Sequence, residues 1–125
     1  MSASNLSILD AFPKREFHES LLRGTPLSKC LFINDILYFK GDGNYSWLIT
    51  TTGQHYLCSR AISFYESYLV NHTDGFIRTH KKCIINVNGV RSFDSEVVIM
   101  LDGYRAPVSR RRKSFVEATL QGIKM

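Results

Sequence analysis

The stretch ILYFKGDGNYSWLITTTGQHYLC (residues 36–58) predicts three consecutive β-strands joined by two tight turns. Its first segment, at residues 36–40, is apolar on both faces, which predicts a strand that is buried on both sides. The second segment, at 44–51, alternates between apolar and polar residues, as a strand with one buried face does. A Thr-Gly pair then predicts the turn into the third strand, at 54–58. This region therefore predicts a sheet of short antiparallel strands.

The rest of the chain continues this pattern of short strands separated by turn residues. Asp102 and Gly103 form the strongest hairpin signal, because Asp-Gly suits the two-residue turns that join antiparallel strands. The segment KKCIINVNGV, at residues 81–90, has no clear period and is interpreted as irregular. Further strands are predicted at residues 17–24 and 27–33, which would form a hairpin, and at 76–80, from about 91, at 96–101 and at 104–108.

Two short helices are predicted, and the chain lacks the strand–helix–strand alternation that would indicate a parallel sheet. The first helix covers residues 59–69, with Ser59 as its N-cap. The second begins near Arg110 and ends near Gln121. Its predicted N-cap is Ser109, its stop signal is Gly122, and its apolar stripe consists of Phe115, Val116, Leu120 and Ile123. Strands and helices together predict a mostly β domain.

The composition is that of one globular domain with one core. The chain has 125 residues, of which 44% are apolar. Residues 1–14 are interpreted as an N-terminal lead-in and residues 15–125 as the folded domain. No apolar run approaches a membrane span, and the N-terminus does not resemble a signal peptide, so we expect a cytoplasmic protein. An odd number of isolated cysteines argues against a disulfide framework or a zinc site, and predicts core thiols at Cys30, Cys58 and Cys83.

Positive charge is concentrated in the C-terminal part of the chain. Residues 1–77 contain six Lys or Arg against seven Asp or Glu, whereas residues 78–125 contain ten against four. The net charge of +5 therefore comes entirely from the second part. An asymmetry of this kind indicates a polyanionic or acidic partner.

The sequence PVSRRRKSF (107–115) places four adjacent cations, at residues 110–113, in the first turns of the last predicted helix. The helix dipole is already positive there, so each cation costs about 0.3–1 kcal/mol at low salt. A solvated helix start is the ordinary interpretation of such a charge run. A bound phosphate would reverse the sign, because the backbone N–H groups, the dipole and the guanidinium groups would all attract it. The placement of charge thus favours contact with nucleic acid.

Two further segments carry polar or basic side chains where strands end. In RTHKK (78–82), Lys81 and Lys82 can reach outward from a loop, although surface solubility would also explain them. His80 is also compatible with a hydrogen-bonded structural role. In KGDGNYSW (40–47), the glycines predict a tight turn and nothing more by themselves. An accessible loop tip there would offer phosphates or base edges the side chains of Asn44, Tyr45 and Ser46.

Nothing in the sequence predicts catalysis, a cofactor or a metal site. The histidines are scattered and lack a zinc-protease motif or a triad-like setting, and most aspartates occur in turn contexts. No residue has the surroundings of an activated nucleophile. We therefore expect a binding protein that is not an enzyme.

In chain order, the segments DILYFKGDGNYSWLITTTGQHYLCSRAISFYESYL, GFIRTHKKCIINVNGVRSF and DGYRAPVSRRRKSFVEATL resemble the LytTR-type DNA-binding domain of bacterial transcriptional regulators. The resemblance runs from about Phe17 to Leu120, with its most specific block at residues 76–90 and a second anchor at PVSRR. It implies an elongated sandwich of several small antiparallel sheets, with about ten short strands and one or two short helices. It also implies that loops enter successive major grooves of a bent duplex, often at paired direct repeats.

The resemblance places DNA contacts in the same three segments that the charges indicate. Arg110 is expected to recognise a base, because its guanidinium can donate two hydrogen bonds to guanine. Lys81 is expected to contact a base edge or a nearby phosphate. Lys82, Arg112 and Lys113 are expected to anchor phosphates. The other contacts implied by the resemblance are Asn44, Tyr45, Ser46, His80 and Ser109.

Family members commonly carry a phosphorylatable receiver domain ahead of this module, and 125 residues leave no room for one. The chain is then either an excised DNA-binding domain or a free-standing regulator. Its candidate partners are double-stranded DNA, a second copy on an adjacent repeat, and an upstream receiver or sensor protein. The alternative function is a protein-interaction module whose basic face binds an acidic signalling partner. RNA binding is less favoured, because the chain lacks an RRM-type aromatic motif.

Overall fold

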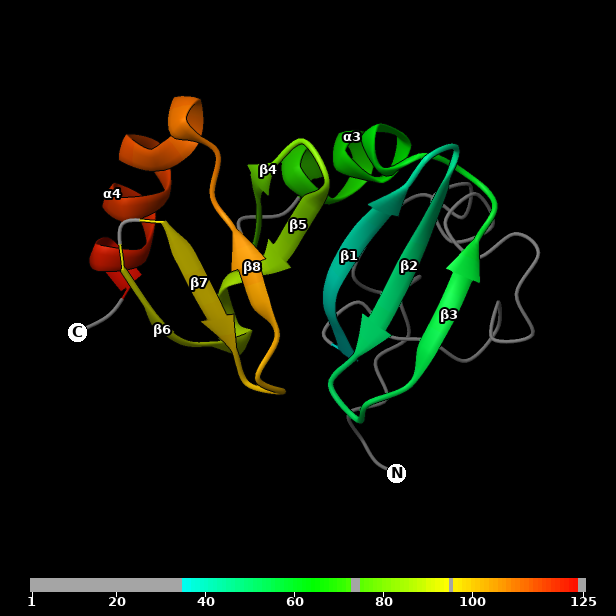
Figure 1. Cartoon of the computed structure of the whole chain (residues 1–125), viewed down its shortest axis with the longest axis horizontal. Helices are drawn as coiled ribbons and strands as arrows, with labels where there is room; N and C mark the ends of the chain where they lie inside the picture. The colour runs from blue at the N-terminus through cyan, green and yellow to red at the C-terminus, as the bar shows by residue number, and fades with distance from the viewer. Residues whose placement is uncertain (1–34, 73–74, 95, 124–125) are drawn as a thin grey trace.

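The computed structural model describes residues 35–72, 75–94 and 96–123, which form two antiparallel β-sheets and two α-helices (Figure 1). The mostly β fold class predicted from the sequence is confirmed, with eight strands in the described residues. The predicted lead-in and the predicted hairpin at residues 17–33 lie outside the described part of the chain. No helix in that described part is long and apolar enough to span a membrane.

The larger sheet has five strands in the order β3-β2-β1-β5-β4. The central strand, β1, is buried over its first four residues, as its two apolar faces predicted. All neighbouring strands pair antiparallel. The strands are β1 (Ile36–Asp42), β2 (Tyr45–Thr50), β3 (His55–Cys58), β4 (Phe76–His80) and β5 (Cys83–Asn86).

Strand β5 lies within the segment that was interpreted as irregular, so that interpretation is wrong for this part. All four residues of β5 are buried, and the strand pairs with β1 on one side and β4 on the other. A short strand buried on both faces has no apolar–polar alternation, so its period gives no indication of a strand. The segment does become irregular after β5, where the 3-10 helix η2 (Val87–Gly89) leads to the second sheet.

Helix α3 (Ile62–His72) covers one face of the larger sheet. Tyr65 is fully buried, and its ring stacks on Phe39 of β1 with 4.9 Å between the ring centroids. The predicted N-cap, Ser59, is wrong, because the helix begins further along the chain. The residue after it, Arg60, instead accepts a hydrogen bond at its carbonyl from a serine hydroxyl of β2, which ties this connection to the sheet before the helix starts.

The smaller sheet has three antiparallel strands in the order β6-β7-β8. The predicted hairpin at Asp102 and Gly103 is confirmed. Gly103 has a φ of 92°, which residues with side chains rarely adopt, and Asp102 Oδ1 accepts a hydrogen bond from the Tyr104 N–H at 2.9 Å. The strands are β6 (Val90–Phe93), β7 (Val97–Met100) and β8 (Arg105–Pro107).

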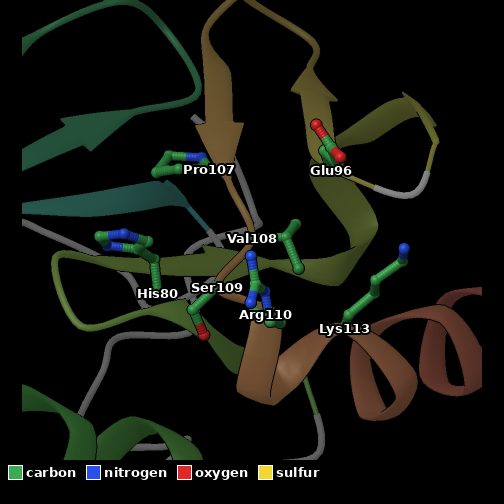
Figure 2. Close-up of a pocket in the computed structure, with 7 residues that line it drawn as sticks. All are labelled: His80, Glu96, Pro107, Val108, Ser109, Arg110 and Lys113. Carbon is green, nitrogen blue, oxygen red and sulfur yellow. The ribbon is translucent and has the colours of Figure 1, made fainter.

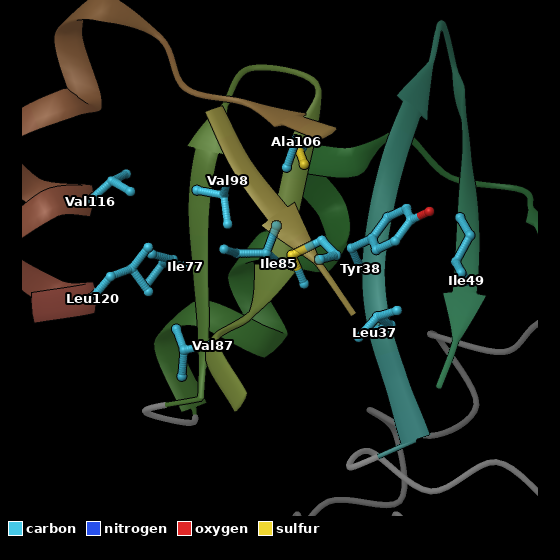
Figure 3. Packing of buried hydrophobic residues seen from close by; sticks show 12 residues of the cluster. Leu37, Tyr38, Ile49, Ile77, Ile85, Val87, Val98, Ala106, Val116 and Leu120 are labelled. Carbon is cyan, nitrogen blue, oxygen red and sulfur yellow. The ribbon is translucent and has the colours of Figure 1, made fainter. Parts of the chain in front are cut away.

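One hydrophobic cluster joins both sheets to α4 (Lys113–Ile123) (Figure 3). Val116 and Leu120 enter this cluster from α4. From the larger sheet, the Tyr38 ring stacks on Tyr104 with 4.3 Å between centroids, and its hydroxyl donates to a carboxylate oxygen of the β7–β8 hairpin at 2.8 Å. These contacts hold the smaller sheet against the larger one.

Helix α4 differs from its prediction at both ends and on one face. The 3-10 turn η3 (Arg110–Arg112) precedes it, and Ser109 occupies the N-cap position of η3 without a side-chain cap hydrogen bond. The helix continues past Gly122, which is therefore not the stop. Phe115 is 58% exposed and does not belong to the buried stripe. Adjacent helical residues point about 100° apart, so Phe115 cannot share the narrow face on which Val116 packs.

Cys58 and Cys83 are free and buried, which confirms the prediction of core thiols for these two residues. Burial raises the pKa of both thiols to about 11. Cys30 lies outside the described part of the chain. Within that part, no group of three or more His, Cys, Asp or Glu side chains could hold a metal ion.

Candidate nucleic-acid interface

The tip of the β1–β2 hairpin carries the first of the three predicted contact segments. Strand pairing ends at Asp42 and Tyr45, and Gly43 in the turn has a φ of 64°, in the region that favours glycine. Asn44 is exposed, and Tyr45 is 51% exposed despite its large aromatic ring. Both side chains are therefore accessible to a ligand.

Ser46 was predicted as a contact in the same segment, but its side chain faces the protein. The residue is fully buried, and its Oγ donates a hydrogen bond to the carbonyl oxygen of Arg60 at 2.8 Å. Successive residues of a strand point to opposite faces, so Ser46 points away from the face on which Tyr45 is exposed. The Ser46 side chain thus ties β2 to the connection before α3.

The second segment is the end of β4 with the turn that follows it. Lys81 and Lys82 form this turn and are both exposed. Nδ1 of His80 accepts a hydrogen bond from the Lys82 N–H at 3.1 Å, so the proton of the neutral ring is on Nε2. Burial, together with the charges of Lys81, Lys82, Arg112 and Arg78, lowers the pKa of His80. The ring is therefore neutral near pH 7 and can donate through Nε2–H.

The third segment follows β8 and leads into α4. The Ser109 N–H donates to the carbonyl oxygen of Thr79 at 2.8 Å, which holds this segment against β4. The Ser109 hydroxyl oxygen is buried and has no hydrogen-bond partner among the described residues, so its main chain is what supports the segment. Arg110 and Arg111 are exposed, and no residue of η3 is buried. The four cations at residues 110–113 thus reach the surface, the last two partly covered.

Main-chain hydrogen bonds connect the three segments along one edge of the domain. The Gly41 N–H, close to the hairpin tip, donates to the carbonyl oxygen of Lys82 at 2.9 Å, which joins the first segment to the second. The bond between Ser109 and Thr79 joins the third segment to the second. In Figure 1 the β1–β2 turn, the β4–β5 turn and the segment before α4 all lie along the upper edge. The fold therefore brings together three segments that are far apart in the sequence.

An open pocket of about 360 Å³ lies between the second and third segments (Figure 2). Its lining includes one carboxylate, Glu96, which stands before β7 as an ordinary exposed residue and which no sequence pattern marked. The lining therefore combines basic side chains with one carboxylate. The other lining residues are His80, Pro107, Val108, Ser109, Arg110 and Lys113.

Comparison with known proteins gives a matching family and a similar fold among solved structures. The family model for the LytTr DNA-binding domain matches residues 28–121, which contain all three segments. The fold is similar to that of the LytTr DNA-binding domain of a Bacillus cereus protein named as a methyl-accepting/DNA response regulator, with a TM-score of 0.57. The two chains are 22% identical, and the match covers 72% of this chain and 84% of the other. No curated protein matches the chain.

Proposed function

The chain belongs to the LytTR family of DNA-binding domains, and on this basis we propose that it binds specific double-stranded DNA sequences for a bacterial transcription regulator. The observation that carries the proposal is the edge on which the three segments meet. Two of these segments are strongly basic, and the third presents exposed polar side chains. Such an edge attracts the phosphate backbone and presents side chains to the grooves.

The basic side chains of the edge suit two kinds of DNA contact. Arg110 is exposed, and its guanidinium can donate two hydrogen bonds to O6 and N7 of a guanine in a major groove. Lys81, which is also exposed, contacts a base edge or a nearby phosphate. Lys82, Arg112 and Lys113 anchor phosphates and so set the register of the domain on the duplex.

The uncharged residues of the edge complete the contacts. His80 adds a donor with a defined direction, because its Nδ1 is occupied by the Lys82 amide and only Nε2–H is available. Asn44 and Tyr45, at the hairpin tip, contact the flanking backbone or a second groove. Ser109 supports the third segment from behind through its main chain.

Loops, and not a recognition helix, enter the DNA in this proposal. Helix α4 packs Val116 and Leu120 on the core, and the run of cations at residues 110–113 lies at its start. The finer parts of the proposal are that the loops enter successive major grooves, that the duplex bends, and that two copies occupy paired direct repeats. A receiver or sensor protein would control the domain from upstream.

Selection from randomised double-stranded DNA tests the proposal. We expect an enriched motif, and an affinity that falls steeply between low and moderate salt because bound phosphates release their counterions. An acidic signalling partner would use the same charges, but then no DNA motif would be enriched. A selection without enrichment, or an affinity that hardly depends on salt, contradicts the proposal.

A further inference from the structure

The turn formed by Lys81 and Lys82, called the dilysine turn below, lacks the backbone conformation that two-residue hairpins prefer. His80 pairs with Cys83, so the two lysines alone connect β4 to β5. The favoured hairpin turns need a positive φ at one or both central residues. Within the described residues, only glycines have a positive φ. The dilysine turn is therefore not one of the favoured two-residue turns, and the hydrogen bonds around it become important.

Donors from Arg78, in the strand that leads into the turn, and from Gly41 of β1 hold three consecutive carbonyl oxygens at this turn. Arg78 Nε donates to the carbonyl oxygen of His80 at 3.1 Å, and a terminal nitrogen of Arg78 donates to that of Lys81 at 2.5 Å. The Gly41 N–H donates to the carbonyl oxygen of Lys82 at 2.9 Å. Because its main chain is held in this way, the turn keeps both lysine side chains at the exposed edge.

Arg78 is itself held by an ion pair with Glu66 of α3. The side chain of Arg78 is 13% exposed and that of Glu66 is 31% exposed, so the pair is largely withdrawn from water. A guanidinium is planar and presents its donors as a rigid fork. The carboxylate on one terminal nitrogen therefore orients the other N–H groups towards the turn. Arg78 faces inward and is not among the groups that the edge offers to DNA.

We propose that Glu66 and Arg78 form a positioning pair that holds the dilysine turn in the shape that DNA recognition requires. The inference rests on the function proposed above. Glu66 then favours specific DNA binding, although its negative charge opposes the approach of DNA. A positioning role predicts that loss of the Glu66 carboxylate weakens binding to the DNA motif, whereas a purely electrostatic role predicts tighter binding. One substitution of Glu66 distinguishes these two outcomes.

The substitution Glu66→Gln removes the charge and keeps the shape of the side chain. If Glu66 acted only through its charge, the variant would bind all DNA more tightly. The positioning role predicts about tenfold weaker binding to the selected motif, a difference on the scale of one hydrogen bond. Binding to random DNA should be equal or tighter. The matched control is Glu117→Gln on α4, which removes an acidic charge that makes no ion pair among the described residues and should weaken neither interaction.

The substitution Arg78→Lys keeps the positive charge but removes the fork, and we expect a similar loss of motif binding. The double variant should lose little more than either single variant, because both changes break the same unit. Equal or tighter motif binding by Glu66→Gln overturns the inference, and so do losses that add in the double variant.

Amide hydrogen exchange of the DNA-free protein separates failure of this inference from failure of the proposed function. The Lys82 N–H donates to His80 across the turn, so we expect it to exchange about tenfold faster in Glu66→Gln, whatever ligand the edge binds. Unchanged exchange at Lys82 overturns the positioning pair. A wild-type chain that selects no DNA motif overturns the proposed function instead. Thermal unfolding of each variant, measured first, gives a temperature at which all of them are folded.

Discussion

Two turns point to the same edge of this domain, but different parts of the molecule hold them in shape. At the β1–β2 tip, Gly43 has a φ of 64°, and nothing lies within 4 Å of a Cβ built there, so the turn depends on its own residues. The dilysine turn contains no glycine, and its carbonyl oxygens are held by Arg78 and Gly41. A turn that is held from outside can present long basic side chains at both of its central positions, where a self-held turn needs glycine or asparagine.

The segment before α4 resembles the dilysine turn in that a contact with another part of the chain holds its main chain. Its main chain is attached to β4 through the Ser109 N–H, and its surface consists of arginines. If this comparison is correct, changes in the externally held segments should alter the choice of DNA sequence. A change at Gly43, the left-handed residue of the hairpin turn, should alter mainly the stability of the fold.

The largest expected effect is that of Arg110→Ala. We expect a loss of about 1–3 kcal/mol in binding free energy and a relaxed base preference at one position of the motif, because a bidentate contact to guanine is lost. Lys113→Ala is the comparison variant, which should weaken binding to all sequences alike and lower the salt slope by about one unit. Affinity measured over a range of salt, together with a repeated selection, distinguishes the two. An equal loss on every sequence for Arg110→Ala would mean that it contacts only the backbone.

The next effect concerns the self-held hairpin. Gly43→Ala should lower the free energy of unfolding by about 1–2 kcal/mol, because a side chain is placed at a left-handed backbone position, while motif preference should stay the same. The control is Gly122→Ala near the C-terminal end of α4, where a Cβ meets nothing within 4 Å and φ is not positive, so stability should not fall. Denaturant unfolding measures both. An unchanged stability for Gly43→Ala would show that tertiary contacts hold this turn too.

The smallest effect is the pH dependence contributed by His80. Its pKa in the folded state is lowered below the usual 6.5, so between these two values the unfolded chain binds more protons than the folded one. The folded state is therefore expected to lose stability as the pH falls through this window below 6.5, and to regain it as the pH rises. His80→Gln should remove this contribution, as denaturant unfolding at several pH values would show. A wild-type chain whose stability rises on acidification across this window contradicts the assignment.

Much of the fold was predictable because its determinants are local. The strands β1, β2, β7 and β8 follow from apolar patterns and from turn residues that act over a few positions. Strand β5 was missed because two neighbouring strands bury both of its faces, which removes the alternation. Phe115 was assigned to the core because the sequence does not say which side of a helix meets the sheets.

The candidate site also contains residues that the sequence indicated and residues that only the structure shows. The basic residues at 110–113 stand out in the sequence because positive charge is costly at the start of a helix, whereas Lys81 and Lys82 stand out only as adjacent cations where a strand ends. The structure exposes most of these residues at one edge. The burial of Ser46 was not predicted, since it depends on which face of β2 meets the rest of the protein. No sequence pattern indicated a role for Glu66. Its role depends on the ion pair with Arg78, which lies in a different secondary-structure element.

By itself, the sequence determined the mostly β class, the glycine-dependent hairpin turns and the basic or polar character of three loops, because backbone preference, hydrophobic period and charge are properties of short segments. Only the tertiary structure decided that these loops share an edge, that Ser46 faces inward and that the dilysine turn rests on Arg78 and Glu66. Those features depend on which strands pair and which helix covers the sheet. Contacts of that kind form between residues that no local pattern links.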